Sequence, residues 1–206
     1  MEKNFVHFIQ ERHSIREYDP SYKISKEELE SILEVATSAP SSRNLQPWRF
    51  VVITDENVKQ EVKEMAFNQQ VFDSCSAVIA VIGDCEMYRN AEHIYQSNVE
   101  AGNMPEELKQ EKVAAIENML PNLSLQVREN IALFDAGLVS MQIMLVARAY
   151  GYDTVTIGGF NKDKFAKRFE LTDRYVPIVL IPIGKAAAPP FKTTRLPINE
   201  ITTFIS

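Results

Sequence analysis

The chain has 206 residues, of which 45% are hydrophobic and 24% are charged, and its formal net charge is −6. These values are typical of a globular domain with enough chain to bury a core, and they exclude a disordered segment. The acidic balance argues against nucleic acid or an anionic membrane surface as a main partner, because both attract a dominant basic face.

Glycine is scarce, and the seven glycines are about half the number expected at the typical frequency of ~7%. No G-x-G-x-x-G and no G-x-x-x-x-G-K-[ST] occurs, so the two common phosphate-binding glycine loops are absent. The first residues, MEKNFVHFIQERHS, contain no apolar run long enough for a signal peptide. Two cysteines without a C-x-x-C make no disulfide framework. We therefore expect a cytoplasmic protein with a single domain over residues 1–206.

In the first half of the chain, helices and strands are predicted in turn. A capping box at Ser25–Glu28 begins a helix over 25–37, with apolar residues at helical spacing. A polar loop follows, and the apolar, β-branched run 48–54 predicts a strand. Asp55 can cap the next helix, and residues 77–82 form a second buried strand. Residues 88–120 are polar and helical, with a break near Gly102 and Pro105.

The second half begins with one long helix from Ser124 to Tyr150, roughly 40 Å in length. It is apolar on more than one face, so we expect it to pack on its own core and on a partner subunit. A short strand over 153–157 and a short helix over 161–169 follow. The strand 176–183 carries two prolines, which favour an edge or irregular position.

Residues 185–206 hold three prolines and no helical period, so they predict an extended C-terminal arm. Its apolar side chains must be buried somewhere, and wrapping a second subunit would bury them. Together the elements predict a mixed sheet of few strands, flanked by helices.

Two polar segments in the first quarter of the chain have side chains suited to ligand recognition. In Arg12-His13-Ser14-Ile15-Arg16, two guanidinium groups and a hydroxyl suit a phosphate or a carbonyl-rich ring. A solvated basic turn is the alternative. The segment 40–48, PSSRNLQPW, holds hydroxyls and amides between prolines, which fix the backbone. It would match the polar edge of a heterocycle, or it is an ordinary polar loop.

Three later segments are weaker by themselves. The amides of Phe67-Asn68-Gln69-Gln70 could recognise a ligand or only complete a helix terminus. Gly158-Gly159, the only adjacent glycines, would let a flat ligand approach the backbone, or they form a tight turn. The stretch 185–195 has three cations and no acid, which indicates an anion site or a solvated tail. The histidines have no metal-ligand spacing and no acid–base dyad stands out, so we expect no metal site.

The motifs R-H-S-I-R, A-P-S-S-x-N-x-Q-P-W, F-N-Q-Q, I-G-G-F and R-L-P follow one another between Glu11 and Ile198. In this order and spacing they resemble the nitroreductase family of flavoproteins. The resemblance implies an α+β fold with a mixed, mainly antiparallel sheet, a long central helix and a domain-swapped homodimer. It also implies two FMN sites at the subunit interface, and NADH or NADPH as electron donor. Electron-poor small molecules such as nitroaromatics or quinones would be reduced by a ping-pong hydride mechanism through flavin N5.

The resemblance further implies roles for single residues. Arg12 and Ser14 would contact the FMN phosphate and ribityl region, and Arg16 the pyrimidine edge near N1 and O2. Pro40, Ser41, Ser42 and Asn44 would come from the other subunit, and Asn68 would hydrogen-bond the isoalloxazine edge. The Ile157-Gly158-Gly159 backbone would lie along the ring, and Arg195 would close on the phosphate from the arm. The expected cofactor-binding residues are Arg12, His13, Ser14, Arg16, Pro40, Ser41, Ser42, Asn44, Gln46, Asn68, Gln70, Ile157, Gly158, Gly159, Lys192 and Arg195. Of these, Arg16, Gly158 and Gly159 are expected to act in the hydride step.

The sequence departs from the family pattern at two cationic positions. Val71 and Thr193 stand where many members carry a lysine. Other activities remain open, namely a flavin-dependent dehalogenase or ene reductase, a non-catalytic FMN-binding protein, and a colourless structural dimer. We expect residues 88–120 to cover the active site and set acceptor choice.

Overall fold

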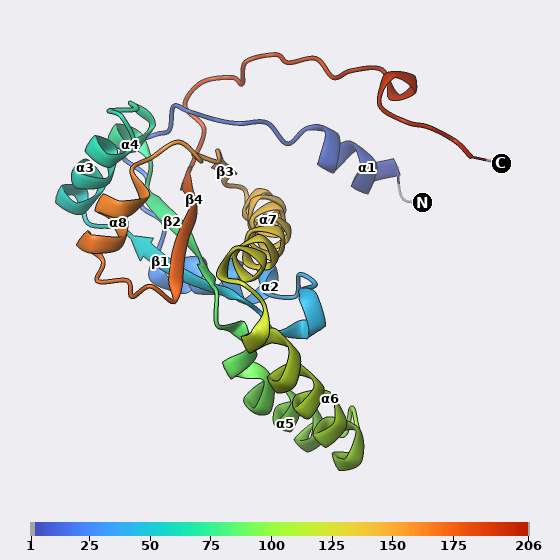
Figure 1. Cartoon of the computed structure of the whole chain (residues 1–206). Coiled ribbons are helices and arrows are strands. Elements are labelled where there is room, and N and C mark those ends of the chain that lie inside the picture. The colour runs from blue at the N-terminus through green and yellow to red at the C-terminus, as the bar shows by residue number, and fades with distance from the viewer. Residues whose placement is uncertain (1–2, 206) are drawn as a thin grey trace.

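The computed structural model describes residues 3–205, and at its centre lies a four-stranded sheet in the order β1-β2-β4-β3 (Figure 1). The strands are β1 (Trp48–Ile53), β2 (Ala77–Asp84), β3 (Asp153–Thr154) and β4 (Tyr175–Gly184). All three pairings between these strands are antiparallel, and a single parallel bridge joins Ser14 to Thr154. The expected α+β class with a mainly antiparallel sheet is confirmed.

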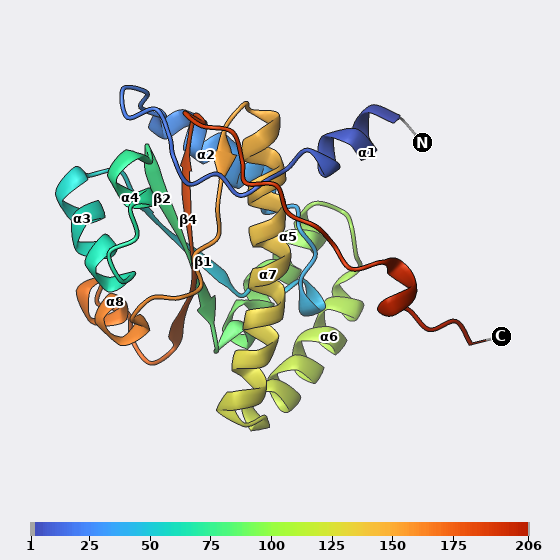
Figure 2. The same ribbon diagram turned by 90° about the horizontal axis from the view of Figure 1, so that it is seen from above.

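Helices cover both faces of the sheet (Figures 1 and 2). One face packs against α2 (Lys26–Ala36) and α7 (Leu125–Ala149), and the other against α3 (Glu56–Met65), α4 (Val71–Ser74) and α8 (Lys162–Arg168). Beyond the sheet, α5 (Ala91–Glu100) and α6 (Glu106–Met119) pack beside the N-terminal half of α7. Helix α1 (Lys3–Gln10) lies away from the sheet and its covering helices. Short 3-10 turns lie at Ser42–Asn44, Met87–Asn90, Leu120–Asn122 and Ile198–Glu200.

Local sequence patterns explain why these elements form. All eight residues of β2 are buried, and the side chains of residues 77–82 alternate between the two apolar clusters on either side of the sheet, as a strand covered on both faces requires. At the start of α2, the Ser25 hydroxyl accepts the Glu28 N–H at 3.2 Å, and the Glu28 carboxylate accepts the Ser25 N–H at 3.1 Å. The predicted capping box is therefore confirmed.

The long helix α7 has 25 residues and begins at the cap Ser124. By length and hydropathy alone it could cross a membrane, but one side of it packs on the sheet and α2. Its outer side exposes Leu133 and Phe134, at 53% and 65% of their surfaces. Both predicted faces, the core face and a second apolar face, are therefore present.

The position of β4 corrects one expectation. The strand is not at an edge, because it pairs with β2 on one side and β3 on the other. The predicted irregularity is present as a register shift near Pro177. The Pro182 carbonyl accepts the Val155 N–H at 3.3 Å, so the backbone of Pro182 points its polar groups toward the β3 side of β4. The two-residue pairing of β3 with β4 has already ended there, so the N–H that proline lacks removes no hydrogen bond of that pairing.

A polar cluster anchors the end of β4, where the C-terminal arm begins. The Tyr152 hydroxyl donates to Glu28 Oε1 at 2.5 Å, and Lys185 Nζ lies 4.3 Å from the centre of the Tyr152 ring. The Tyr152 hydrogen bond is the main reason why the pKa of Glu28 is lowered.

We expect Tyr152→Phe to lower the free energy of unfolding at neutral pH by about 1 kcal/mol. Folding lowers the pKa of Glu28. The stabilisation from its hydrogen bond is therefore fully present when the pH is above the pKa of Glu28 in the unfolded chain, and it is lost as the pH falls through the pKa in the folded protein. The gap between wild type and variant should therefore narrow in acid. Thermal melts at pH 7 and pH 3 measure it, and an equal gap at both would contradict the assignment.

Candidate functional site

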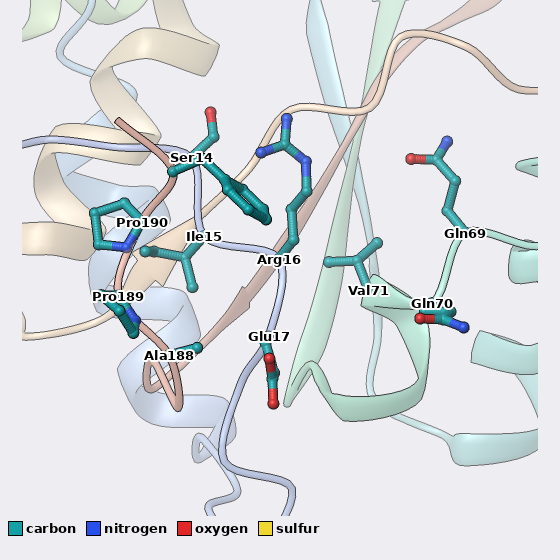
Figure 3. Close-up of a pocket in the computed structure, with 11 residues that line it drawn as sticks. Ser14, Ile15, Arg16, Glu17, Gln69, Gln70, Val71, Ala188, Pro189 and Pro190 are labelled. Carbon is teal, nitrogen blue, oxygen red and sulfur yellow. The ribbon is translucent and has the colours of Figure 1, made fainter. Parts of the chain in front are cut away.

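Two adjoining clefts lie where three parts of the chain meet. These parts are residues 12–19, called the N-terminal segment below, the start of α4, and the C-terminal arm. The larger, of about 390 Å³, is lined by residues 14–17, 69–71 and 188–191 (Figure 3). The smaller, of about 160 Å³, is lined by residues of 12–16 and of 191–195. They share Ser14, Arg16 and Phe191, so they lie next to each other, and together they are called the hollow.

Strand-like pairing aims the side chains of the N-terminal segment. The Ile15 N–H donates to the Thr154 carbonyl at 3.1 Å, and the Ile15 side chain is buried in a cluster with Val71 and Ile157. Successive side chains of an extended segment point to opposite sides, so Ser14 and Arg16 face away from this cluster. Figure 3 shows Ser14, Arg16 and Gln69 extending to the same side, while Glu17 points the other way.

The C-terminal arm (residues 185–205) reaches the hollow because its first residues pair with the N-terminal segment. The Asp19 N–H donates to the Lys185 carbonyl at 2.8 Å, and the Ala187 N–H donates to the Glu17 carbonyl at 3.0 Å. The arm then runs past residues 14–17, which places Arg195 in the same cleft as Arg12. The predicted extended arm is present, and Ser206 lies outside the described residues.

Three guanidinium groups line the smaller cleft, those of Arg12, Arg16 and Arg195. Within residues 3–205, none of them forms an ion pair with a carboxylate. Arg195 Nη1 donates to Thr193 Oγ1 at 3.0 Å and to the Thr194 carbonyl at 2.8 Å, which limits its orientations. Cations without a counter-charge, beside the Ser14 hydroxyl, suit a phosphate ester.

The two amide-bearing segments contain strained backbone. Six non-glycine residues of the described chain have a left-handed φ, and five of them lie in these segments. They are Arg43, Asn44, Gln46, Phe67 and Asn68, with φ between 48° and 59°. Such residues cost energy unless the surroundings hold them, and they gather at ligand sites.

Most of the expected residues near the N-terminal segment come together. Arg12, His13, Ser14, Arg16, Gln70 and Arg195 all line the hollow. Asn68 and Lys192 are exposed but do not line it, and their neighbours Gln69 and Thr193 do. The motif F-N-Q-Q pointed to the amides of this segment and therefore included Gln69. Which of these amides faces the cleft depends on the left-handed backbone at residues 67 and 68, which the motif does not reveal.

The glycine pair sits at the surface beyond a short bridge. Ile157 is buried and exchanges hydrogen bonds with Leu180, at 2.8 and 3.0 Å. Gly158 and Gly159 follow, and a Cβ on either would meet no atom of the described chain within 4 Å. Neither glycine lines the hollow of the isolated chain, and no packing within it requires glycine there.

The segment 40–46 lies elsewhere, beside α5 and α7. The Ser42 N–H and hydroxyl donate to Asp135 of α7, and Asn44 and Gln46 line a third cleft of about 270 Å³ with His93 and other residues of α5. This cleft shares no residue with the hollow around Arg16. Within one chain, the two groups of expected residues are therefore not brought together.

Sequence reasoning did not select the residues that hold segment 40–48 in place. The buried Asp84 carboxylate binds Arg174 at 2.6 and 2.7 Å and Arg49 at 3.2 Å. Arg49 Nη1 in turn donates to the Trp48 carbonyl at 2.7 Å, and Asn90 Nδ2 donates to the Leu45 carbonyl at 3.1 Å. The signal was a carboxylate at the end of a buried strand, which requires a cationic partner.

The chain matches a family model described as the nitroreductase family over residues 9–185. It is similar to YdgI of Bacillus subtilis (strain 168), named as a candidate NAD(P)H nitroreductase, with 48% identity over 200 residues and 96% of each chain covered. It is also similar to a CLA biosynthesis enone reductase of Lactiplantibacillus plantarum, with 35% identity over 198 residues and 95% and 91% covered.

A solved structure of an Exiguobacterium sibiricum 255-15 protein in complex with FMN is similar along nearly its whole length. The TM-score is 0.94 and the sequence identity 48%, with 98% of this chain and 97% of that chain covered. The chain therefore shares its backbone fold with a protein whose solved structure contains FMN.

Proposed function

The chain belongs to the nitroreductase family, and from that premise we propose that it is an FMN-dependent oxidoreductase. NADH or NADPH is the electron donor, and electron-poor molecules such as nitroaromatics or quinones are the acceptors. The observation that carries this proposal is the hollow lined by Arg12, Arg16 and Arg195, whose cations have no carboxylate partner within residues 3–205.

The donor set of this hollow fits FMN. Arg12, Ser14 and Arg195 would hold the phosphate, because guanidinium and hydroxyl groups are strong donors to its oxygens. Arg16 lines both clefts and would face the pyrimidine edge, near the amides of Gln69 and Gln70. The open space above Gly158 and Gly159 suits the close approach of a flat ring.

When bound, FMN would supply the redox chemistry, namely acceptance of a hydride from NAD(P)H at N5 and transfer of electrons to the acceptor. The Arg16 guanidinium would stabilise the negative charge that develops at the pyrimidine edge. The Gly158 and Gly159 backbone would lie along the ring and would offer N–H donors to it. No side-chain acid or base is needed for the hydride step.

We propose further that the protein acts as a homodimer, in which segment 40–46 of one subunit completes the hollow of the other. Apolar side chains of α1, the outer side of α7 and the arm are exposed, with Phe204 and Ile205 at 90% and 96%. In Figures 1 and 2, α1 and the arm extend away from the sheet and its covering helices. A monomer would leave this surface in water, and a second copy would bury it.

We propose a cytoplasmic location. The acidic balance of the chain supports a small-molecule acceptor and no nucleic-acid or membrane partner. Residues 88–120 include most of the 3-10 turn Met87–Asn90 and the helices α5 and α6, and α5 lines the cleft with Asn44 and Gln46. If segment 40–46 faces the partner's flavin, α5 contributes to acceptor choice at that site.

One absorbance spectrum tests the proposed function. We expect the purified protein to be yellow, to bleach when NADH or NADPH is added without oxygen, and to recover its colour when a nitroaromatic or quinone follows. A yellow protein that does not bleach would be a non-catalytic FMN-binding protein. A colourless protein that takes up no added FMN would contradict the proposal and favour a structural dimer.

A second candidate function is reduction of an α,β-unsaturated ketone. Similarity to an enone reductase of Lactiplantibacillus plantarum favours it over dehalogenation. Both activities would use the same hollow and the same donor. Product analysis with a nitroaromatic, a quinone, an enone and a halogenated aromatic separates them, because each leaves a different product.

A further inference from the structure

Asp135 of α7 carries a carboxylate that has 0% exposure and a single neighbouring donor residue. The Ser42 N–H donates to Asp135 Oδ2 at 2.9 Å, and the Ser42 hydroxyl donates to Oδ1 at 3.0 Å. No cation within residues 3–205 forms an ion pair with this carboxylate. Burial raises the pKa of Asp135, and the two hydrogen bonds from Ser42 act against the rise.

These contacts determine which way the two serine hydroxyls of the segment point. The proton of the Ser42 hydroxyl is committed to Asp135, so its oxygen can only accept a further hydrogen bond. The Ser41 hydroxyl has the opposite hydrogen-bonding role, because its oxygen accepts the Gln46 N–H at 3.0 Å. Within the described chain the Ser41 proton is given to no acceptor, so it is free to be donated.

We propose that Asp135 is a positioning residue for the cofactor, which acts through Ser42 by turning that hydroxyl into an acceptor. The segment then offers a ligand one donor, Ser41, beside one acceptor, Ser42. The matching ligand presents an oxygen acceptor to Ser41 and a hydroxyl or ring N–H to Ser42. This inference rests on the proposed function, in which segment 40–46 contacts FMN.

Asp135 is distinct from the other groups that hold the segment. Asn90 and Arg49 bind the carbonyls of Leu45 and Trp48, and they contact neither serine hydroxyl. They can fix the path of the backbone, but only Asp135 sets the direction of the Ser42 proton. Changing Asp135 should therefore alter recognition of the ligand, beyond any effect on stability.

Asp135→Asn tests the proposal with little change in shape. The asparagine oxygen can still accept the Ser42 N–H, but its amide must donate to Ser42 Oγ, which turns the hydroxyl proton toward the ligand. Two donors then face each other, and we expect the FMN dissociation constant to rise about tenfold. Titration of FMN-free protein, followed by quenching of flavin fluorescence, measures it.

A double-mutant cycle separates this role from a purely structural one. Ser42→Ala alone should also weaken FMN binding about tenfold, and adding Asp135→Asn to it should weaken binding no further. Ser140 is the matched control, because it is buried on the same helix and its hydroxyl has no partner within the described chain. Ser140→Ala should leave the FMN dissociation constant within about twofold of wild type.

Two results would overturn this inference and leave the proposed function standing. One is FMN binding that Asp135→Asn does not change, and the other is an Asp135→Asn substitution that weakens FMN binding as much in the Ser42→Ala protein as in the wild type. Wild-type protein that takes up no FMN would overturn it together with the proposed function. If Asp135→Asn does not fold, Ser42→Ala decides by itself: a tenfold loss supports the proposal and unchanged binding refutes it.

Discussion

Replacement of Arg16 by alanine is expected to slow the reduction of protein-bound FMN by NADH or NADPH by roughly a hundredfold. Arg16 is the guanidinium group that lines both clefts, and within residues 3–205 it has no carboxylate partner. Its charge is therefore available to the ligand. Removing it leaves the negative charge that develops during hydride transfer without a fixed cation, which raises the barrier.

Stopped-flow absorbance at full FMN occupancy measures this rate, so that weaker FMN binding is not mistaken for slower chemistry. Arg16→Lys should lose less than Arg16→Ala, because it keeps a charge but not the planar fork. Lys164→Ala is the control, since it removes one exposed cation on α8, outside both clefts. An Arg16→Ala enzyme that is reduced at the wild-type rate would remove Arg16 from the hydride step.

Removal of residues 188–206 is expected to give a monomer that binds FMN about a hundredfold more weakly, which is equivalent to ~2.7 kcal/mol. The deleted segment lines both clefts and contains Arg195 and a series of exposed apolar side chains. Stopping after Ala187 keeps the pairing of the arm with Glu17 and Asp19, so the rest of the fold retains its contacts. Sedimentation gives the assembly state, and absorbance gives the FMN content.

Arg195→Ala separates the two roles of the arm. It should weaken FMN binding about tenfold through the lost charge-assisted hydrogen bonds, and it should leave the dimer intact. A truncated protein that remains dimeric would show that α1 and the outer side of α7 hold the subunits together without the arm.

Local patterns were sufficient to predict most of the elements. The capping box at Ser25 begins α2, the apolar run after Ser76 forms β2, and Ser124 begins α7. The predictions of these three elements were correct because capping, alternation and helical spacing are properties of neighbouring residues. The edge position of β4 was wrong because pairing partners come from distant parts of the chain, and α1 was not predicted.

The candidate site was predictable as a set of segments and not as an arrangement. The sequence by itself determined that guanidinium and hydroxyl groups gather in residues 12–16 and amides in residues 68–70, and it contained the family motifs. Tertiary structure alone decided that Arg195 meets Arg12, and that segment 40–46 lies away from both. It alone joined Ser42 to Asp135, which is 93 positions away in the chain. Such contacts depend on how helices and strands pack on one another, and no local pattern of side chains records that packing.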